Sequence, residues 1–266
     1  MKRSTRALAG TVLLILAVAV GTSVAAELRE SSQGKARPSG ADTEPRAGHV
    51  HSSPPAARHK VNLGRSVRGR PIVAVPTGNP ISSQTVLVVG CIHGNEPAGI
   101  AIAKDLLSDP GPVGQRLWVL PVLNPDGRAA DTRQNARGVD LNRNFPYRWR
   151  PLGPPGTLEY SGPHALSEPE SRAAHAFIER IRPHISIWFH QAQDLVDRSG
   201  GSVAVERRYA QLVDLPLRRL PRYPGSAAGW ENHRFRRTTA FVVELPPGRL
   251  SPAEVERFSD GVLRLR

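Results

Sequence analysis

Four short segments of the sequence each end in side chains that could bind a metal ion or take part in catalysis. The segments are Val-Val-Gly-Cys-Ile-His93-Gly-Asn-Glu96, Gly-Val-Asp140-Leu-Asn142-Arg143-Asn-Phe, Ile-Trp-Phe-His190-Gln and Phe-Val-Val-Glu244-Leu. Three of them place that group just after an apolar, β-branched run where a strand would end, and ligands bind at the carboxyl ends of strands in open α/β sheets. A His and a Glu three residues apart, joined by a distant His, supply the three protein ligands of a catalytic zinc and leave a fourth position for water. The pattern therefore predicts a metal-dependent hydrolase.

Each potential metal ligand also has a simpler explanation when it is taken alone. His93 and Glu96 could be a turn histidine beside a carboxylate at a helix N-terminus, where the helix dipole favours negative charge. His190 could be a hydrogen-bonded histidine at the edge of a sheet. The combination of all three favours the metal site.

Glu244 follows an apolar run and would emerge from the core at a strand end. Burying a carboxylate without a partner is costly, and a carboxylate beside a metal-bound water can take its proton and return it to a leaving nitrogen. The alternative is a salt bridge to Arg236 or Arg237. Cys91 lies two residues before His93, and although thiolates bind zinc, we interpret it as a small buried side chain at a strand end.

Strands and helices alternate along the chain. Apolar runs predict strands over residues 70–75, 85–90, 117–123, 184–189 and 240–243, and apolar periodicity and caps predict helices over residues 97–107 and 167–181 and from residue 251 onward. Ser167 with Glu170, and Ser251 with Glu254, have the spacing of capping boxes. The alternation predicts an α/β fold with a mostly parallel mixed sheet and helices on both faces.

The chain divides into three regions. Residues 1–26 have a basic start, an apolar run over residues 7–20 and small residues before position 27, which is the build of a secretory signal peptide. Residues 27–58 are rich in Ser, Gly, Pro and Ala without apolar periodicity and predict a disordered linker. Residues 59–266 have the size of one catalytic domain. We therefore expect an exported protein with no stable membrane span after removal of the leader.

The net charge limits the partners. The formal charge of +13 includes three basic and no acidic residues in the leader, so +10 remains from residue 27 onward. Such a surface favours anionic surroundings, such as a cell-wall polymer. No nucleic-acid-binding module is recognisable, and we expect no nucleic-acid partner. A single cysteine excludes an internal disulfide framework.

Taken together, six motifs resemble the zinc metallocarboxypeptidase family, and its compact bacterial form, the murein peptide amidases, in particular. The motifs are His93-Gly-Asn-Glu96, Asn124-Pro-Asp-Gly127, the run from Arg133 to Phe145, Ser167-Glu-Pro-Glu170, His190 and Glu244. The resemblance implies hydrolysis of a carboxy-terminal peptide or amide bond, here the γ-D-glutamyl to diaminopimelate bond of a wall-derived peptide. It also implies the fold of that family.

Roles for individual residues follow from this resemblance. His93, Glu96 and His190 would bind one zinc ion, with Glu244 as general base and acid. Arg133 would polarise the scissile carbonyl, a role for which Arg137 is the competing candidate.

The resemblance also implies a substrate-binding set. Asn142 and Arg143 would hold the terminal carboxylate of the substrate, which suits the two-pronged geometry of a guanidinium. Asp140 would orient His93 and fix its tautomer. Tyr223 would cap the bound substrate, although its spacing to Trp230 departs slightly from the family pattern, and a packed loop tyrosine is the alternative.

The pocket for the terminal side chain is less clearly defined by the sequence. Small residues at 227–229 suggest space rather than a countercharge, and the many Arg residues in 207–222 and 234–237 suggest a solvated basic face. Three acidic residues could reach the pocket from neighbouring loops: Asp194, Asp197 and Glu231.

Two other functions stay open at this point. One is an N-acyl amino acid deacylase of the aspartoacylase and succinylglutamate desuccinylase type, which shares the His-x-x-Glu pair and the later His. The other is a catalytically inactive wall-binding relative. The signal-peptide-like leader and the long motif at residues 133–145 argue against the deacylase. The inactive relative is disfavoured because none of the expected catalytic residues is missing from the sequence. A peptide substrate and a monomeric protein are expected.

Overall fold

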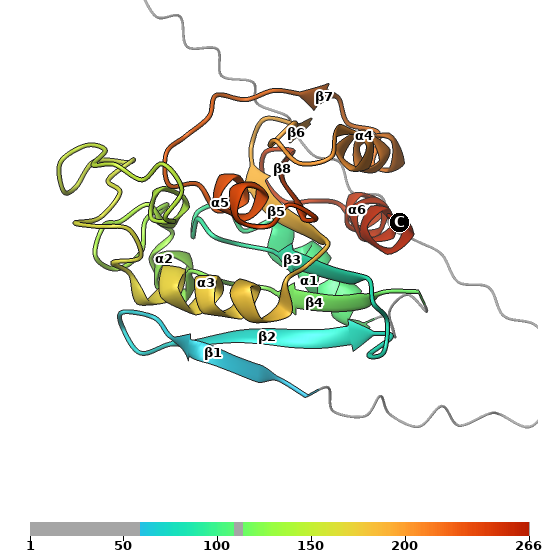
Figure 1. Cartoon of the computed structure of the whole chain (residues 1–266), viewed down its shortest axis with the longest axis horizontal. Helices are drawn as coiled ribbons and strands as arrows, with labels where there is room; N and C mark the ends of the chain where they lie inside the picture. The colour runs from blue at the N-terminus through green and yellow to red at the C-terminus, as the bar shows by residue number, and fades with distance from the viewer. Residues whose placement is uncertain (1–58, 109–113, 266) are drawn as a thin grey trace, which may run out of the picture. The chain divides into compact units, whose positions relative to one another are not determined.

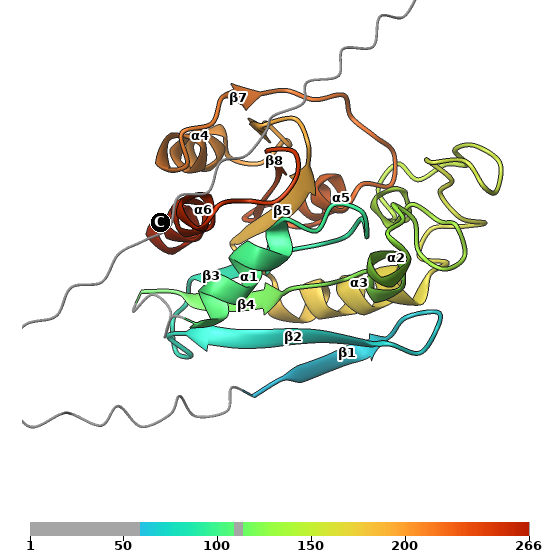
Figure 2. The ribbon, with the colours of Figure 1, turned by 180° about the vertical axis from the view of Figure 1, so that it is seen from behind.

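The computed structural model describes residues 59–108 and 114–265. The predicted leader (1–26) and linker (27–58) lie outside the described residues, so both stay predictions. The described residues form one mixed sheet with helices on its two faces (Figures 1 and 2). The predicted α/β fold is confirmed.

Eight strands form the sheet in the order β1-β2-β4-β3-β5-β8-β6-β7. The strands are β1 (Val61–Arg65), β2 (Pro71–Gly78), β3 (Thr85–Val89), β4 (Arg116–Leu120), β5 (Ile185–Gln191), β6 (Leu195–Asp197), β7 (Leu217–Arg218) and β8 (Thr239–Leu245). The four central strands, β4, β3, β5 and β8, are parallel to one another. On one side β2 pairs antiparallel with β4 and with β1, and on the other β6 pairs antiparallel with β8 and parallel with β7.

The helices cover both faces of the sheet. They are α1 (Gly99–Ser108), α2 (Pro125–Ala130), α3 (Pro169–Ile181), α4 (Val203–Leu212), α5 (Ala227–Arg234) and α6 (Pro252–Arg264), with a 3-10 turn η1 (Leu141–Arg143). Figure 1 shows α3 and α5 in front of the sheet, and Figure 2 shows α1 in front of it from behind. None of the helices in the described ranges is both long and apolar enough to span a bilayer.

Alternation along the central strands builds a core on each face. In β3, Val86 and Val88 pack into the core that includes residues of α1, α4 and α6, while Leu87 and Val89 pack into the core that includes residues of α3 and α5. Successive side chains of a strand point to opposite faces, and the central strands are apolar on both, as expected for a parallel sheet covered by helices. In β5 this alternation places His190 on the same face as Trp188, toward α3 and α5.

The two predicted capping boxes have different outcomes. The Ser251 hydroxyl accepts from the Glu254 amide and the Glu254 side chain accepts from the Ser251 amide, so this box is confirmed. The box at Ser167 is wrong, because the cap of α3 is Glu168. Glu170 instead accepts from the Val67 amide and from Asn135, contacts distant in sequence that outcompete the local cap.

Candidate active site

The three predicted metal ligands lie on a turn and at a strand end. His93 and Glu96 lie between β3 and α1, and His190 lies near the end of β5. The turn is close to a second motif, because a Cβ on Gly94 would lie 1.9 Å from the carbonyl carbon of Gly127. Only glycine permits this approach. The contact fixes the path of the chain between His93 and Glu96.

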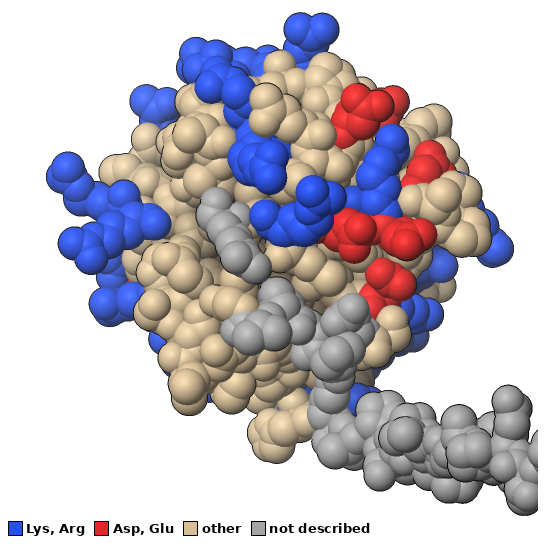
Figure 3. Space-filling model, turned by 90° about the vertical axis from the view of Figure 1, so that its right-hand side faces the viewer, with Lys and Arg blue, Asp and Glu red and all other residues tan. Residues whose placement is uncertain are grey.

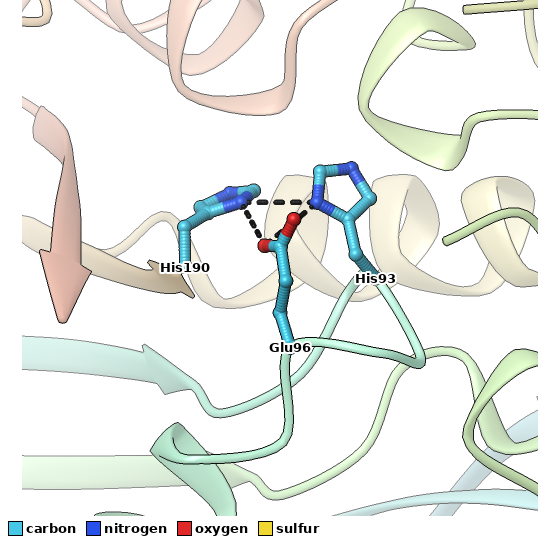
Figure 4. A group of neighbouring side chains, drawn as sticks. All are labelled: His93, Glu96 and His190. Atoms are coloured by element: carbon cyan, nitrogen blue, oxygen red, sulfur yellow. Dashed lines mark hydrogen bonds and ion pairs between the residues drawn. The ribbon is translucent and has the colours of Figure 1, made fainter. Parts of the chain in front are cut away.

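The ligand atoms of these three side chains meet at one point (Figure 4). His93 Nδ1 lies 2.9 Å from Glu96 Oε2 and 3.1 Å from His190 Nδ1, and His190 Nδ1 lies 3.0 Å from the same oxygen. All three side chains are buried. Among the described residues, this is the group of His, Cys, Asp and Glu side chains that could hold a metal ion.

The chemistry of the donor set fits a zinc ion. The Asp140 carboxylate can only accept a hydrogen bond, so His93 Nε2 donates to Asp140 Oδ1 at 3.0 Å and His93 Nδ1 presents a lone pair. That lone pair faces a carboxylate oxygen of Glu96, and a cation between them removes the repulsion. Tetrahedral zinc with bonds of about 2.0 Å to nitrogen holds its ligand atoms about 3.3 Å apart. The three observed separations are close to that spacing.

Ionic contacts surround the ligands. Burial alone would raise the pKa of Glu96, but His93 and His190 hold it well below its usual range. Burial would likewise raise the pKa of Asp140, which His93 and Arg133 hold low. Both carboxyl groups are therefore ionised at neutral pH. Burial lowers and the two carboxylates raise the pKa of His93, and the net direction is upward.

Arg133 lies beside the ligands, whereas Arg137 does not. Arg133 Nη1 donates to Glu96 Oε1 at 2.8 Å and its Nε donates to Asp140 Oδ2 at 3.0 Å. Arg137 is exposed and lies 3.5 Å from Glu168. Only Arg133 of the two lines the cavity described below.

Glu244 lies directly beside His190, because β5 and β8 are parallel neighbours whose register pairs these two residues. Its Oε2 atom is buried without a hydrogen-bond partner, and burial raises the pKa of the carboxyl group. Within the described ranges, Glu244 forms no ion pair with Arg236 or Arg237, which are exposed. The salt-bridge alternative does not hold in this structure.

The predicted carboxylate-binding residues lie on η1 and the loop before α5. The buried Arg143 donates to Glu159 Oε1 at 3.0 Å, and its guanidinium lies 4.0 Å from the centre of the Tyr223 ring. The Asn142 side-chain oxygen accepts from the Ala227 amide at 2.9 Å. Tyr223 is thus a partly exposed ring that packs on Arg143. Sequence analysis did not identify Glu159, which no local pattern links to Arg143.

A cavity of about 510 Å³ connects these groups. We call His93, Glu96, His190 and Glu244 its metal end, and Asp197, Ser199 and Arg222 its far end. The residues that line the space between and around the two ends include Arg133, Asn142, Arg143, Tyr223, Ala228, Gly229 and Val242.

The structure corrects the predicted pocket in three places. Ala228 and Gly229 line the cavity, but Ala227 is buried in the core. Of the three acidic candidates, only Asp197 lines it, while Glu231 is buried against Ser186 and Trp188. Arg222, which was assigned to a solvated face, donates to Asp197. The pairing links separate loops, so neither residue type nor spacing reveals it.

Cys91 is not one of the side chains whose ligand atoms meet at the candidate metal site. It is fully buried, its thiol donates to the carbonyl oxygen of His93 at 3.1 Å, and burial raises its pKa to about 12. A neutral thiol is a poor zinc ligand. The interpretation as a small buried side chain agrees with this geometry.

Comparison with known proteins adds three findings. A family model described as zinc carboxypeptidase matches residues 47–202. Murein peptide amidase A of Escherichia coli strain K12 is 32% identical over 201 residues, which cover 71% of this chain and 81% of that protein. Murein peptide amidase A of Vibrio campbellii is also 32% identical, over 200 residues that cover 70% of this chain and 79% of that protein.

Solved structures of a murein-tripeptide amidase and of a carboxypeptidase also resemble this chain. The crystal structure of murein-tripeptide amidase MpaA from Escherichia coli O157 superposes with a TM-score of 0.67 and 27% identity, covering 81% of this chain and 94% of that one. Carboxypeptidase A from Helicoverpa armigera superposes with a TM-score of 0.64 at 21% identity, covering 78% of this chain and 67% of that one, a likeness of fold.

Proposed function

Because this chain belongs to the zinc carboxypeptidase family and is therefore a peptidase or amidase, we propose that it removes a carboxy-terminal residue from peptides of the bacterial cell wall. The bond cut is the amide between γ-D-glutamate and diaminopimelate. The observation that carries the proposed chemistry is the meeting of three potential metal-binding side chains in one cavity with Glu244 and the buried Arg143. One buried oxygen of Glu244 has no hydrogen-bond partner. The wall-peptide substrate is supported by the similarity to murein peptide amidases along most of both chains.

His93 Nδ1, Glu96 and His190 Nδ1 would hold one zinc ion. Zinc in such a site acts as a Lewis acid that makes a water nucleophilic near neutral pH and polarises a carbonyl group. Asp140 keeps His93 in the tautomer whose Nδ1 is free to bind, through its hydrogen bond to Nε2. The family requires zinc, and the donor set of this chain fits it.

Glu244 has the position and acidity of the proton carrier. It lies beside His190 in the sheet, and its pKa is raised by burial, toward the value at which a carboxylate both accepts and returns a proton efficiently. Glu244 takes a proton from the attacking water as the water oxygen bonds to the carbonyl carbon. It then gives this proton to the amide nitrogen as the carbon–nitrogen bond breaks. The second proton of the water passes from the new carboxyl group to the amine, and a carboxylate and an ammonium group are released.

Arginine side chains orient the substrate. Arg133 has used two of its five N–H donors on Glu96 and Asp140, so others are left for the carbonyl oxygen that gains negative charge. Arg143 and Asn142 hold the terminal carboxylate, which restricts the enzyme to a chain end. Tyr223, packed on Arg143 at the cavity, caps the bound residue.

We also propose that the protein acts outside the cytoplasm. This proposal depends on the leader-like residues 1–26 and on the net charge of +10 that remains from residue 27 onward, which is the total of +13 less the three basic residues of the leader. Figure 3 shows basic side chains spread over the upper and left-hand parts of one face, with acidic side chains gathered on its right. A basic surface favours residence near an anionic wall.

Hydrolysis by the purified, zinc-loaded protein tests the function. L-Ala-γ-D-Glu-diaminopimelate is compared with ordinary peptides that end in Phe, Lys or Glu, with a chelator-treated sample as control. Chelator-sensitive release of diaminopimelate alone is the expected result. Cleavage of only the ordinary peptides would move the function to a general carboxypeptidase, and no cleavage of either would contradict the proposal.

A further inference from the structure

The far end of the cavity contains an ion pair that the hydrolytic step does not use. Arg222 Nη1 donates to Asp197 Oδ2 at 2.8 Å. The Asp197 residue is only 3% exposed, whereas about a third of the Arg222 side chain, 36%, is exposed. Both line the same cavity as Glu244.

The Asp197 carboxylate is held in a fixed orientation. Its Oδ1 accepts from the Leu220 amide at 2.8 Å and its Oδ2 accepts from the Ser199 hydroxyl at 2.6 Å. The Ser199 hydroxyl in turn accepts from the Val242 amide at 3.1 Å. Asp197 is therefore fastened to β8, the strand that carries Glu244, and is not a freely moving surface group.

The position of this pair relative to the scissile bond follows from the strand. Val242 lies two residues before Glu244 on β8 and therefore on the same face, about 7 Å away along the strand. In the proposed reaction, Arg143 holds the carboxylate of the terminal residue, and the amide bond of that residue is cut beside Glu244. The side chain of the terminal residue is then directed into the remaining cavity. That space is bounded by Val242, Asp197 and Arg222. A long side chain spans this distance.

The paired charges select a particular chemistry. A substrate side chain with only an ammonium group is attracted by Asp197 and repelled by Arg222. A substrate side chain with only a carboxylate is attracted by Arg222 and repelled by Asp197. A side chain that ends in both an ammonium and a carboxylate satisfies both residues at once. Specificity of this kind comes from repulsion of wrong partners as much as from attraction of the right one.

We propose that Asp197 and Arg222 are the side-chain specificity residues of this enzyme and recognise a terminal residue whose side chain itself ends as a zwitterionic amino acid. Asp197 accepts from the distal ammonium and Arg222 donates to the distal carboxylate. Diaminopimelate has this chemistry. The inference rests on the proposed function, since it assumes that the terminal residue lies between Arg143 and Glu244.

Binding to the zinc-loaded Glu244→Gln protein tests the inference without turnover. Three peptides L-Ala-γ-D-Glu-X are titrated calorimetrically, where X is diaminopimelate, lysine, which lacks the distal carboxylate, or 2-aminopimelate, which lacks the distal amine. Each lost charged hydrogen bond weakens binding about tenfold or more. We expect diaminopimelate to bind at least about tenfold more tightly than either analogue. Equal affinities, or no binding of any of the three, would overturn the inference.

Variants of Asp197 and Arg222 test whether these two residues cause the preference for diaminopimelate. Arg222→Met removes the partner of the distal carboxylate, so diaminopimelate and lysine peptides should approach equal affinity. Asp197→Asn should reduce the preference for diaminopimelate over 2-aminopimelate. Arg219→Met, an exposed arginine outside the cavity, is the matched control and should keep the wild-type ranking. An unchanged ranking in Arg222→Met, which is partly exposed and should fold normally, would contradict the proposal even if Asp197→Asn were unstable.

Hydrolysis by the wild type separates this inference from the proposed function. If the γ-linked peptides bind in the expected order but are not cut, the proposed function fails and the specificity residues stand. If all three are cut at equal rates and bound with equal affinity, the function stands and the specificity residues fail.

Discussion

The metal end and the far end of the cavity are built from different parts of the sheet. His190 and Glu244 lie on the neighbouring central strands β5 and β8, and His93 follows the central strand β3. Asp197 instead ends the short strand β6, and Arg222 follows β7 at the sheet edge. The metal end is thus built on and directly after central strands that are buried on both faces, whereas the far end is built on peripheral segments.

The two ends also differ in charge. At the metal end the ionised Glu96 faces two imidazoles and accepts from Arg133, while one buried oxygen of Glu244 has no hydrogen-bond partner. At the far end Arg222 already neutralises Asp197. Catalytic groups need fixed positions in a desolvated site, while loops on a rigid scaffold can change specificity without disturbing them. Residues of the far end can therefore be altered in this protein without disturbing the metal end.

The largest expected effect is at the metal end. Glu244→Gln keeps the side-chain volume but removes the proton acceptor, so kcat should fall by about 10³-fold or more. Zinc content, measured by mass spectrometry, should stay at the wild-type level. His190→Ala is the contrasting variant and should lose zinc as well as activity. Wild-type turnover in Glu244→Gln would remove Glu244 from the mechanism.

A second prediction concerns Glu231 on α5, the helix whose Ala228 and Gly229 line the cavity. Glu231 links this helix by hydrogen bonds to β5, the strand that carries His190. It accepts from Ser186 and from Trp188 Nε1, the latter at 2.7 Å, and burial raises its pKa to about 7, well above the usual value of a glutamate. Below the pKa that Glu231 has in the unfolded chain, the carboxyl group is neutral in both the folded and the unfolded state. As the pH rises from that pKa to the higher pKa of the folded state, the carboxyl group ionises only in the unfolded chain. The folded state therefore loses about 3 kcal/mol of stability over this range.

Urea unfolding of metal-free protein measures this loss. Between about pH 4 and pH 8 the free energy of unfolding of the wild type should fall by about 3 kcal/mol more than that of Glu231→Gln, whose amide does not titrate. Glu256→Gln, at an exposed position on α6, should behave like the wild type. Parallel pH profiles for wild type and Glu231→Gln would show that Glu231 does not control this dependence.

The third prediction tests substrate anchoring between the two ends. Arg143→Ala removes the guanidinium that holds the terminal carboxylate, and KM should rise by about 10- to 100-fold, as expected for a lost charge-assisted contact. Zinc content should not change, because Arg143 contacts none of the three ligands. Arg150→Ala, an exposed arginine on the following loop, serves as the control. Loss of zinc in Arg143→Ala would instead show that Arg143 supports metal binding rather than substrate binding.

The smallest effect is expected at Tyr223. Its ring lies 4.0 Å from the Arg143 guanidinium, and such a contact at a partly exposed site contributes about 1 kcal/mol. Tyr223→Ala should therefore raise KM by about fivefold, while Tyr223→Phe, which keeps the ring, should raise it less. A larger loss of kcat in Tyr223→Phe would instead indicate that the hydroxyl group acts on the substrate.

Local patterns in the sequence were sufficient for much of the fold. The apolar runs of β3, β5 and β8 and the periodicity of α1 predicted the central elements, because strands and helices that are buried against a core need those residues. The strands β1, β6 and β7 and the helices α2, α4 and α5 were not predicted. Strands β6 and β7 have only 3 and 2 residues, too few for a pattern, and β1 mixes polar and apolar residues with a glycine. The Arg-rich composition near α4 suggested only a solvated surface.

The failed capping box shows the limit of local reasoning. Ser167 and Glu170 have the required spacing, yet Glu170 pairs with Val67 and Asn135. The fully buried Glu170 carboxylate meets donors from two segments that are distant in the sequence. Tertiary contacts therefore overrode the local capping signal.

Local sequence was enough to specify the residue types of the proposed metal site, the three-residue spacing of His93 and Glu96, and the strands that carry His190 and Glu244. The meeting of these groups, the place of Arg133 rather than Arg137 beside them, and the pairing of Asp197 with Arg222 were visible only in the folded chain. The physical reason is range: strand and turn formation depends on neighbouring residues, whereas the meeting of two charges depends on the pairing of strands and loops far apart in the chain.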